Sequence, residues 1–195
     1  MPELESLLDL AKGDRILTIP ESSWLEYEAI AKIDSRYLIS FIDNVITIVA
    51  PGRNHERITE TIKILINAYC RKYRIPYFAL GSEDIKKENV VGKQPDASYC
   101  FESLKPEADL AIEVNFTSGS INDLEKYRRL NIKEVWIWQQ NKLRFFSLLN
   151  DNFIEVKTSI ALDKITSDFL SSFLQRATEY DNLTIETNFF ESLNF

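Results

Sequence analysis

The chain has 195 residues, of which 45% are hydrophobic and 27% are charged, and this composition is typical of one ordinary folded domain. Its 30 acidic and 23 basic residues give a net charge of −7, which opposes tight nonspecific binding of nucleic acid, so any contact with DNA would need a local basic face. No stretch is long and apolar enough to span a membrane, the N-terminus is acidic where a secretory signal carries Lys or Arg, and two cysteines cannot form a disulfide framework, so we expect a cytoplasmic protein with no membrane partner.

The first half of the chain predicts a helix, a hairpin and a long helix. Ser22 and Ser23 can cap a short helix that begins at Trp24. Two β-rich runs, 37–42 and 45–49, are separated by Asp43 and Asn44, which is typical of a hairpin. Apolar residues then recur at helical spacing and predict an amphipathic helix. They are Ile58, Ile62, Leu65, Ile66, Tyr69 and Tyr73.

The second half predicts mostly strands. Short β-rich runs occupy 77–80, 96–101, 109–116 and 135–138, with a polar helix over about 121–130. Two further strands flank the turn at 150–152, and Thr166 or Ser167 can cap a last helix. No repeat or linker divides the chain, so we expect a single domain over 1–195, with a core of about 36–180 and a tail over 181–195. Helices covering a sheet in this order predict a mixed α/β architecture.

Alternation along segment 109–116 separates an apolar face from a polar one, because successive strand side chains point to opposite faces. The apolar face holds Leu110, Ile112, Val114 and Phe116. The other face holds Asp109, Ala111, Glu113 and Asn115. Two carboxylates on one strand face can simply meet solvent, or they can form part of a site.

A second strand favours the site. Asp96 opens segment 96–101 after a proline and shares a face with Ser98 and Cys100. If the two strands are neighbours, Asp96 lies opposite the face that carries Asp109 and Glu113. Converging carboxylates repel one another, and a hard cation such as Mg²⁺ offsets that repulsion. The simpler alternative is that Asp96 is a turn residue at a strand start.

The spacing of these residues resembles the PD-(D/E)XK signature of restriction-endonuclease-like nucleases: Pro95-Asp96, then Glu113-Val114-Asn115. A wider set of segments occurs in the order found in the Uma family, which is abundant in cyanobacteria. They are SWLEYEAI (23–30), APGRNHERI (50–58), GSEDI (81–85), PDASYCF (95–101), DLAIEVNFTSGS (109–120) and YRRLNIKEVWIW (127–138). The resemblance implies an α/β fold with a restriction-endonuclease-like mixed central sheet flanked by helices, extended by a C-terminal β-meander and helix.

The resemblance also implies roles for individual residues. Asp96 and Glu113 match the motif carboxylates that bind a divalent metal, Mg²⁺ or Mn²⁺, and the backbone carbonyl of Val114 would be a third ligand. Asp109 matches the residue that begins the Glu-bearing strand, which implies a supporting role next to the metal ligands. In this kind of site the metal lowers the pKa of a bound water and stabilises charge on the scissile phosphate.

The sequence departs from the signature at its lysine. The residue two positions after the Glu is Asn115, which leaves an amide as a supporting group. The Uma family typically carries the lysine on the following helix, where this chain has Asp123. Lys126 lies three residues later on the same helix face, so we expect it to assist the attacking water. The alternative is an ordinary solvated lysine.

His55 is the only histidine and falls within the apolar stripe of its helix, so it faces the sheet. It is either a hydrogen-bonded core residue or a supporting group of the site, as its match to the family's histidine implies. Glu56 at the flank of the stripe is a further supporting candidate.

The leading hypothesis is therefore a metal-dependent endonuclease that hydrolyses DNA phosphodiester bonds, with a homodimer as its candidate assembly. The alternative is a catalytically decayed nuclease-fold module that binds protein or nucleic acid. A third reading is a scaffold that self-associates through the aromatic tail, which carries Phe189, Phe190 and Phe195.

Overall fold

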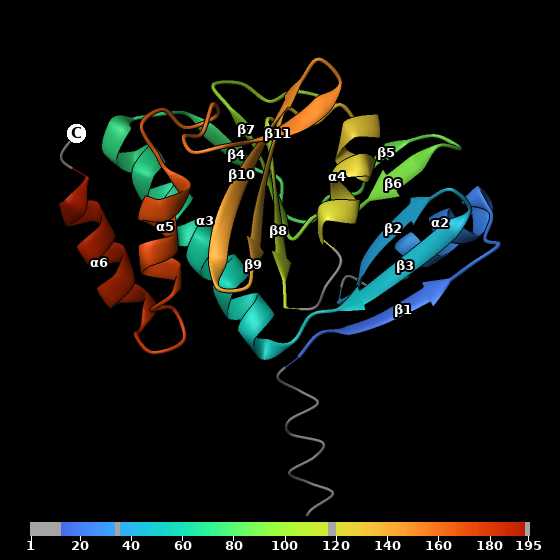
Figure 1. The fold of residues 1–195 in the computed structure, drawn as a ribbon, viewed down its shortest axis with the longest axis horizontal. Coiled ribbons are helices and arrows are strands. Elements are labelled where there is room, and N and C mark those ends of the chain that lie inside the picture. Colours follow the sequence, from blue (N-terminus) through green and yellow to red (C-terminus); the bar gives the residue numbers. More distant parts are fainter. Residues whose placement is uncertain (1–12, 34–35, 117–119, 194–195) are drawn as a thin grey trace, which may run out of the picture.

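The computed structural model describes residues 13–33, 36–116 and 120–193, and these form two β-sheets and five helices (Figure 1). The elements in chain order are β1 (Arg15–Ile19), α2 (Trp24–Ala31), β2 (Leu38–Ile42), β3 (Val45–Ala50), α3 (Arg53–Tyr73), β4 (Tyr77–Ala79), β5 (Ile85–Lys87), β6 (Val91–Lys93), β7 (Ala97–Phe101), β8 (Leu110–Asn115), α4 (Ser120–Arg129), β9 (Glu134–Gln139), β10 (Lys142–Leu149), β11 (Asn152–Val156), α5 (Ser167–Leu174) and α6 (Asn182–Ser192).

The larger sheet is mixed, with strand order β11-β10-β9-β8-β7-β4. Its central strand β8 runs antiparallel to β7, with Ala97 opposite Ile112, and parallel to β9, with Leu110 opposite Glu134. Strands β9, β10 and β11 form an antiparallel meander. The predicted mixed sheet and its C-terminal meander are both confirmed.

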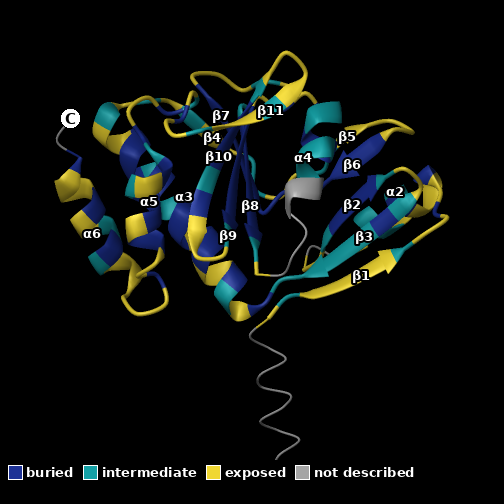
Figure 2. Cartoon of the chain, viewed as in Figure 1, coloured by how far each residue is buried: buried dark blue, intermediate teal, exposed yellow. Residues whose placement is uncertain are grey.

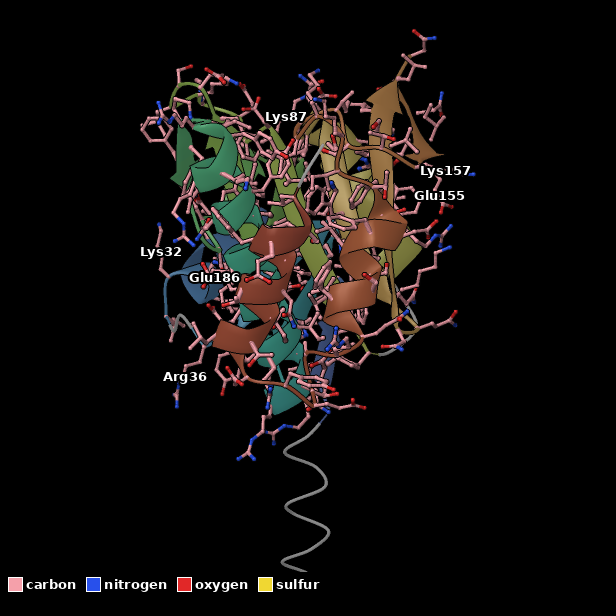
Figure 3. All side chains as sticks on the ribbon, turned by 90° about the vertical axis from the view of Figure 1, so that its left-hand side faces the viewer. Lys32, Arg36, Lys87, Glu155, Lys157 and Glu186 are labelled. Carbon is pink, nitrogen blue, oxygen red and sulfur yellow. The ribbon has the colours of Figure 1, made fainter. Side chains whose placement is uncertain are left out.

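One face of this sheet is covered by α3, α5 and α6, as the left half of Figure 1 shows. The apolar side of β8 predicted from alternation packs here, and Trp136 stacks on Phe145 with ring centroids 4.3 Å apart. Helix α6 joins this core by burying Phe189 completely. At the surface, Glu186 of α6 pairs with Arg71 of α3 (Figure 3).

The fold buries one aromatic residue of the segment proposed for self-association and leaves its neighbour at the surface. Phe189 lies in the core, and Phe190 lies 4.7 Å from the ammonium of Lys72. Phe195 lies outside the described residues.

The opposite face of the larger sheet packs against α4 and the second sheet. Ala111, Val135 and Ile137 meet Tyr127 of α4 and Val91 of β6 in one buried cluster. Figure 2 shows β8 and β9 as almost wholly buried, whereas β1 at the far edge of the second sheet is exposed. The centre of the molecule is therefore the seam between β8, α4 and β6.

The second sheet has strand order β1-β3-β2-β6-β5. Its β2–β3 hairpin confirms the prediction, since Ile42 pairs with Val45 and both turn residues, Asp43 and Asn44, have positive φ, as a type I′ turn requires. Strands β1, β5 and β6 were not predicted. β1 is exposed, and β5 and β6 have three residues each, so neither gives a readable alternation.

Candidate functional site

Asp96 and Glu113 are brought together by the register of β7 on β8. Ala97 lies opposite Ile112, so the preceding residue on β7 and the following residue on β8 are also neighbours. The backbone N–H of Asp96 donates to the Ile112 carbonyl at 3.1 Å, and Oδ2 of Asp96 accepts from the N–H of Val114 at 2.6 Å. Both residues are buried: the exposed fraction is 7% for Asp96 and 3% for Glu113.

Val114 presents backbone groups to the same place. The N–H and C=O of a strand residue point to one edge, and the N–H of Val114 points at Asp96. Its carbonyl therefore faces the Asp96 side of β8. Two carboxylates and one carbonyl are the oxygen donors that Mg²⁺ accepts, with water completing its shell. Among the described residues, no three His, Cys, Asp or Glu side chains are grouped as a metal cluster.

His55 links Asp96 to Asp14. Its Nε2 lies 2.5 Å from Oδ1 of Asp96, and its Nδ1 lies 3.1 Å from Oδ2 of Asp14. Asp14 is fixed in turn by the N–H of Gly52 at 2.9 Å, at the start of α3. Burial lowers the pKa of His55, but its hydrogen bonds to Asp14 and Asp96 outweigh burial and raise that pKa to about 10. An imidazolium thus holds Asp96 in one orientation.

Glu113 is held by two groups on the other side of the seam. Lys93 donates from Nζ to Oε2 at 3.0 Å, and the hydroxyl of Tyr127 donates to Oε1. Burial raises the pKa of Glu113, Lys93 lowers it, and nearby Asp96 adds to the rise. The pKa of Lys93 is raised because the carboxylates of Asp123, Glu113 and Asp96 outweigh the effect of burial.

Lys126 does not contact Glu113 in the structure. Its Nζ pairs with Oδ1 of Asp123 at 2.5 Å, one helical turn away on α4. Asp123 is itself largely buried, and its pKa is lowered by Lys93 and Lys126 against the effect of burial. The lysine that touches the motif glutamate is therefore on β6 and not on α4.

The other supporting candidates fall at different distances from this pair. Asp109 lies four residues before Glu113, at the opposite end of β8, where it accepts from Lys105 at 2.6 Å and from the N–H of Phe101 at 2.8 Å. The structure does not bring it to Asp96. Asn115 lies at the site end of β8, and its buried Nδ2 has no hydrogen-bond partner.

A cleft of about 170 Å³ opens over Asp96. Its walls include Glu56 and Thr59 of α3, Ser82, Arg36 and Lys63. Thr59 is only 4% exposed, yet its hydroxyl has no hydrogen-bond partner. A buried donor with no partner costs free energy, and Thr59 is part of the cleft wall.

Three groups of the site were missed in the sequence: Asp14, Lys93 and Tyr127 as a hydrogen-bond donor. Tyr127 lies in one of the family-like segments but was not singled out as a site residue. Lys93 lies three residues before Asp96 in a segment for which no strand was expected, and its two-residue alternation with Val91 was the one available signal. Asp14 carried none, since it meets His55 only through tertiary structure.

The comparisons with known proteins concern the fold and the family of the chain. Among solved structures, the chain is similar to a protein from Anabaena variabilis ATCC 29413 described as a putative nuclease belonging to DUF820, with 15% identity and a TM-score of 0.50. That match covers 70% of this chain and 90% of the other, and it concerns the fold alone. The comparison with curated proteins gave no match. None of the described helices is long and apolar enough to cross a membrane.

A family model, Uma2, described as "Putative restriction endonuclease", matches residues 24–179. This range holds both carboxylates, His55 and Lys93, and it covers most of the sequence. The chain belongs to the Uma2 family.

Proposed function

We propose that the protein is a divalent-metal-dependent nuclease that hydrolyses DNA phosphodiester bonds at Asp96 and Glu113. The observation that carries the proposal is the pairing of these two buried carboxylates at adjacent strand positions. Like charges held together in a protein interior are costly unless a cation or a proton joins them. The arrangement therefore calls for positive charge, which His55 and Lys93 supply within the protein and to which a bound divalent ion would add.

The donor set fits a hard divalent ion: Asp96, Glu113 and the carbonyl of Val114 would hold it. When bound, the ion would supply a water of lowered pKa and stabilise charge on the phosphate. The chain's own groups prepare that site. His55 orients Asp96, while Tyr127 hydrogen-bonds Glu113.

The cleft over Asp96 is the proposed route of the substrate. Arg36 and Lys63 line the cleft together with Glu56, Glu60 and Asp96, and Lys63 pairs with Glu60 at 2.6 Å. The lining therefore holds more carboxylates than cations, which in a protein whose net charge is −7 predicts weak, salt-sensitive DNA binding. The unpartnered hydroxyl of Thr59 can donate to a phosphate oxygen there.

The test is cleavage of supercoiled and single-stranded DNA in Mn²⁺, with and without a chelator, beside the variants Glu113→Gln and Glu155→Gln. Glu155 lies on exposed β11 (Figure 3) and pairs with Arg144, so its variant controls for purification and for loss of one charge. We expect cleavage by the parent and by Glu155→Gln, and none by Glu113→Gln or in chelator. Equal cleavage by all three proteins would identify a contaminant and contradict the proposal.

A non-catalytic binding module is the second candidate, because both carboxylates already contact an internal cation: His55 on Asp96 and Lys93 on Glu113. Calorimetric titration with Mn²⁺ separates the two. A nuclease site binds Mn²⁺ and loses it in Asp96→Asn, whereas a decayed site gives the same trace for both proteins.

A further inference from the structure

Glu113 makes one ion pair among the described residues, and its partner is Lys93. Both side chains are almost completely buried, so solvent screens the pair little. Three carboxylates raise the pKa of the Lys93 ammonium through their charge: Asp123, Glu113 and Asp96. Lys93 is therefore the cation on which the acidic groups of this site converge.

The position of Lys93 is set by the alternation of β6. Val91, two residues earlier, is fully buried against Ala111 of β8 and Tyr127 of α4, so Lys93 projects toward the same seam. Gly92 faces the other way, where a Cβ atom would overlap the ring of Tyr27. β6 is also held on both sides, by Ser40 of β2 and Ile85 of β5 opposite Lys93. The ammonium is thus placed by a rigid sheet.

Lys126 is arranged differently. Its ammonium is taken by Asp123 at 2.5 Å, and Asp123 in turn acts on Lys93. Both lysines therefore interact with the carboxylate of Asp123, and of the two only Lys93 contacts Glu113. In this site the cation, Lys93, lies on β6 and the carboxylate, Asp123, lies on α4. A lysine on α4 facing an acid on β6 would give the same pair of charges with the two positions exchanged.

Resting on the proposed nuclease function, we propose that Lys93 supplies the positive charge of this site in place of a lysine on α4, with Asp123 as its counter-charge. As a positioning residue, Lys93 fixes Oε2 of Glu113 while Tyr127 fixes Oε1. It also offsets negative charge that would otherwise oppose an approaching phosphate. Lys126 holds Asp123 and has no direct part in the chemistry.

The experiment exchanges the charges between the two elements. Lys93→Met alone leaves Glu113 buried without its cation and can fail to fold, so the test variant is Lys93→Met/Asp123→Asn, which removes one charge of each sign. The exchange variant is Lys93→Asp/Asp123→Lys. The control is Lys87→Met, an exposed lysine of the neighbouring strand β5 (Figure 3). For each protein, kcat and KM for DNA cleavage, Mn²⁺ affinity and the melting temperature are measured.

We expect Lys93→Met/Asp123→Asn to melt cooperatively, to bind Mn²⁺ and to lose about 100-fold in kcat with little change in KM. The exchange variant should recover at least tenfold of that loss, which a merely structural role of Lys93 would not produce. A fall in kcat of less than tenfold relative to Lys87→Met, or no recovery of kcat in the exchange variant, would overturn the role assigned to Lys93 and leave the proposed nuclease function standing. Absence of Mn²⁺-dependent cleavage by the parent would overturn the proposed function and this assignment with it.

Discussion

Replacing Thr59 with valine should change the stability of the protein and its cleavage of DNA in opposite directions. Valine has the shape of threonine without the hydroxyl, and that hydroxyl is buried in the cleft wall with no hydrogen-bond partner. A buried polar group without a partner costs roughly 1–3 kcal/mol. Thr59→Val should therefore raise the free energy of unfolding by about 1–2 kcal/mol.

For a chain of this length that gain corresponds to a rise of roughly 2–8 °C in melting temperature. Cleavage should move in the opposite direction. A lost hydrogen bond to a charged phosphate costs about 1.5–3 kcal/mol, which is roughly a 10- to 100-fold fall in kcat/KM. Differential scanning calorimetry and a DNA cleavage assay on the same preparation measure both changes.

The matched control is Thr61→Val, two residues along α3. Thr61 is also buried, but its hydroxyl donates to the Arg57 carbonyl at 2.8 Å. We expect this variant to be unchanged or about 1 kcal/mol less stable, with normal cleavage. A lower melting temperature for Thr59→Val would show that its hydroxyl has a partner, and unchanged cleavage would remove the cleft from the substrate path.

Three further outcomes follow from single contacts. The pKa of His55 rises from 6.5 in the unfolded chain to about 10 in the folded one, so its stabilisation is complete below pH 6.5 and disappears as the pH rises through 10. The free energy of unfolding, measured by urea denaturation in chelator, should fall by on the order of 5 kcal/mol at most across that window. The variant His55→Asn should show a smaller dependence on pH. Gly92→Ala pushes a methyl group into the ring of Tyr27 and should lower the free energy of unfolding by about 1–3 kcal/mol. The control Gly13→Ala, which has no atom within 4 Å of the added methyl group, should have the melting temperature of the parent. Equal melting temperatures for the two variants would contradict the close contact between β6 and Tyr27. Glu134→Gln should cost about 1.5–3 kcal/mol in urea denaturation, since Glu134 is fully buried and its oxygens accept from Trp136 and from two backbone N–H groups; a neutral result would mean that an amide satisfies those donors.

The two motif carboxylates could be predicted from the sequence because each belongs to a strand with readable alternation. The apolar face of β8 and the apolar face of β7 both pack under α3, as expected. Once both faces are known, Asp96 and Glu113 must lie on the other side. Local patterning was sufficient here since the strands are adjacent in the chain and in the sheet.

The same alternation suggested that Asp109 lies near the site, and the structure places it elsewhere. It shares a face with Glu113, but four residues along a strand separate them by roughly 13 Å. Sharing a face therefore did not bring Asp109 to the site, and Lys105 and the N–H of Phe101 are its partners instead. Alternation predicts which side a residue occupies, and only the register with the next strand predicts its neighbours.

Asp14 and Lys93 could not be found in this way, because each comes from a segment whose place depends on tertiary structure. Asp14 reaches His55 across the start of α3, and Lys93 reaches Glu113 from a three-residue strand of another sheet. Lys126 was expected near Glu113 from the family resemblance and from its spacing on α4, yet neither reveals that Asp123 holds Lys126. A motif defined by acidic residues on one sheet can thus retain its geometry while the compensating positive charge moves to another element. The acceptor side of such a site is therefore predictable from local sequence, and its cation has to be identified from the assembled fold.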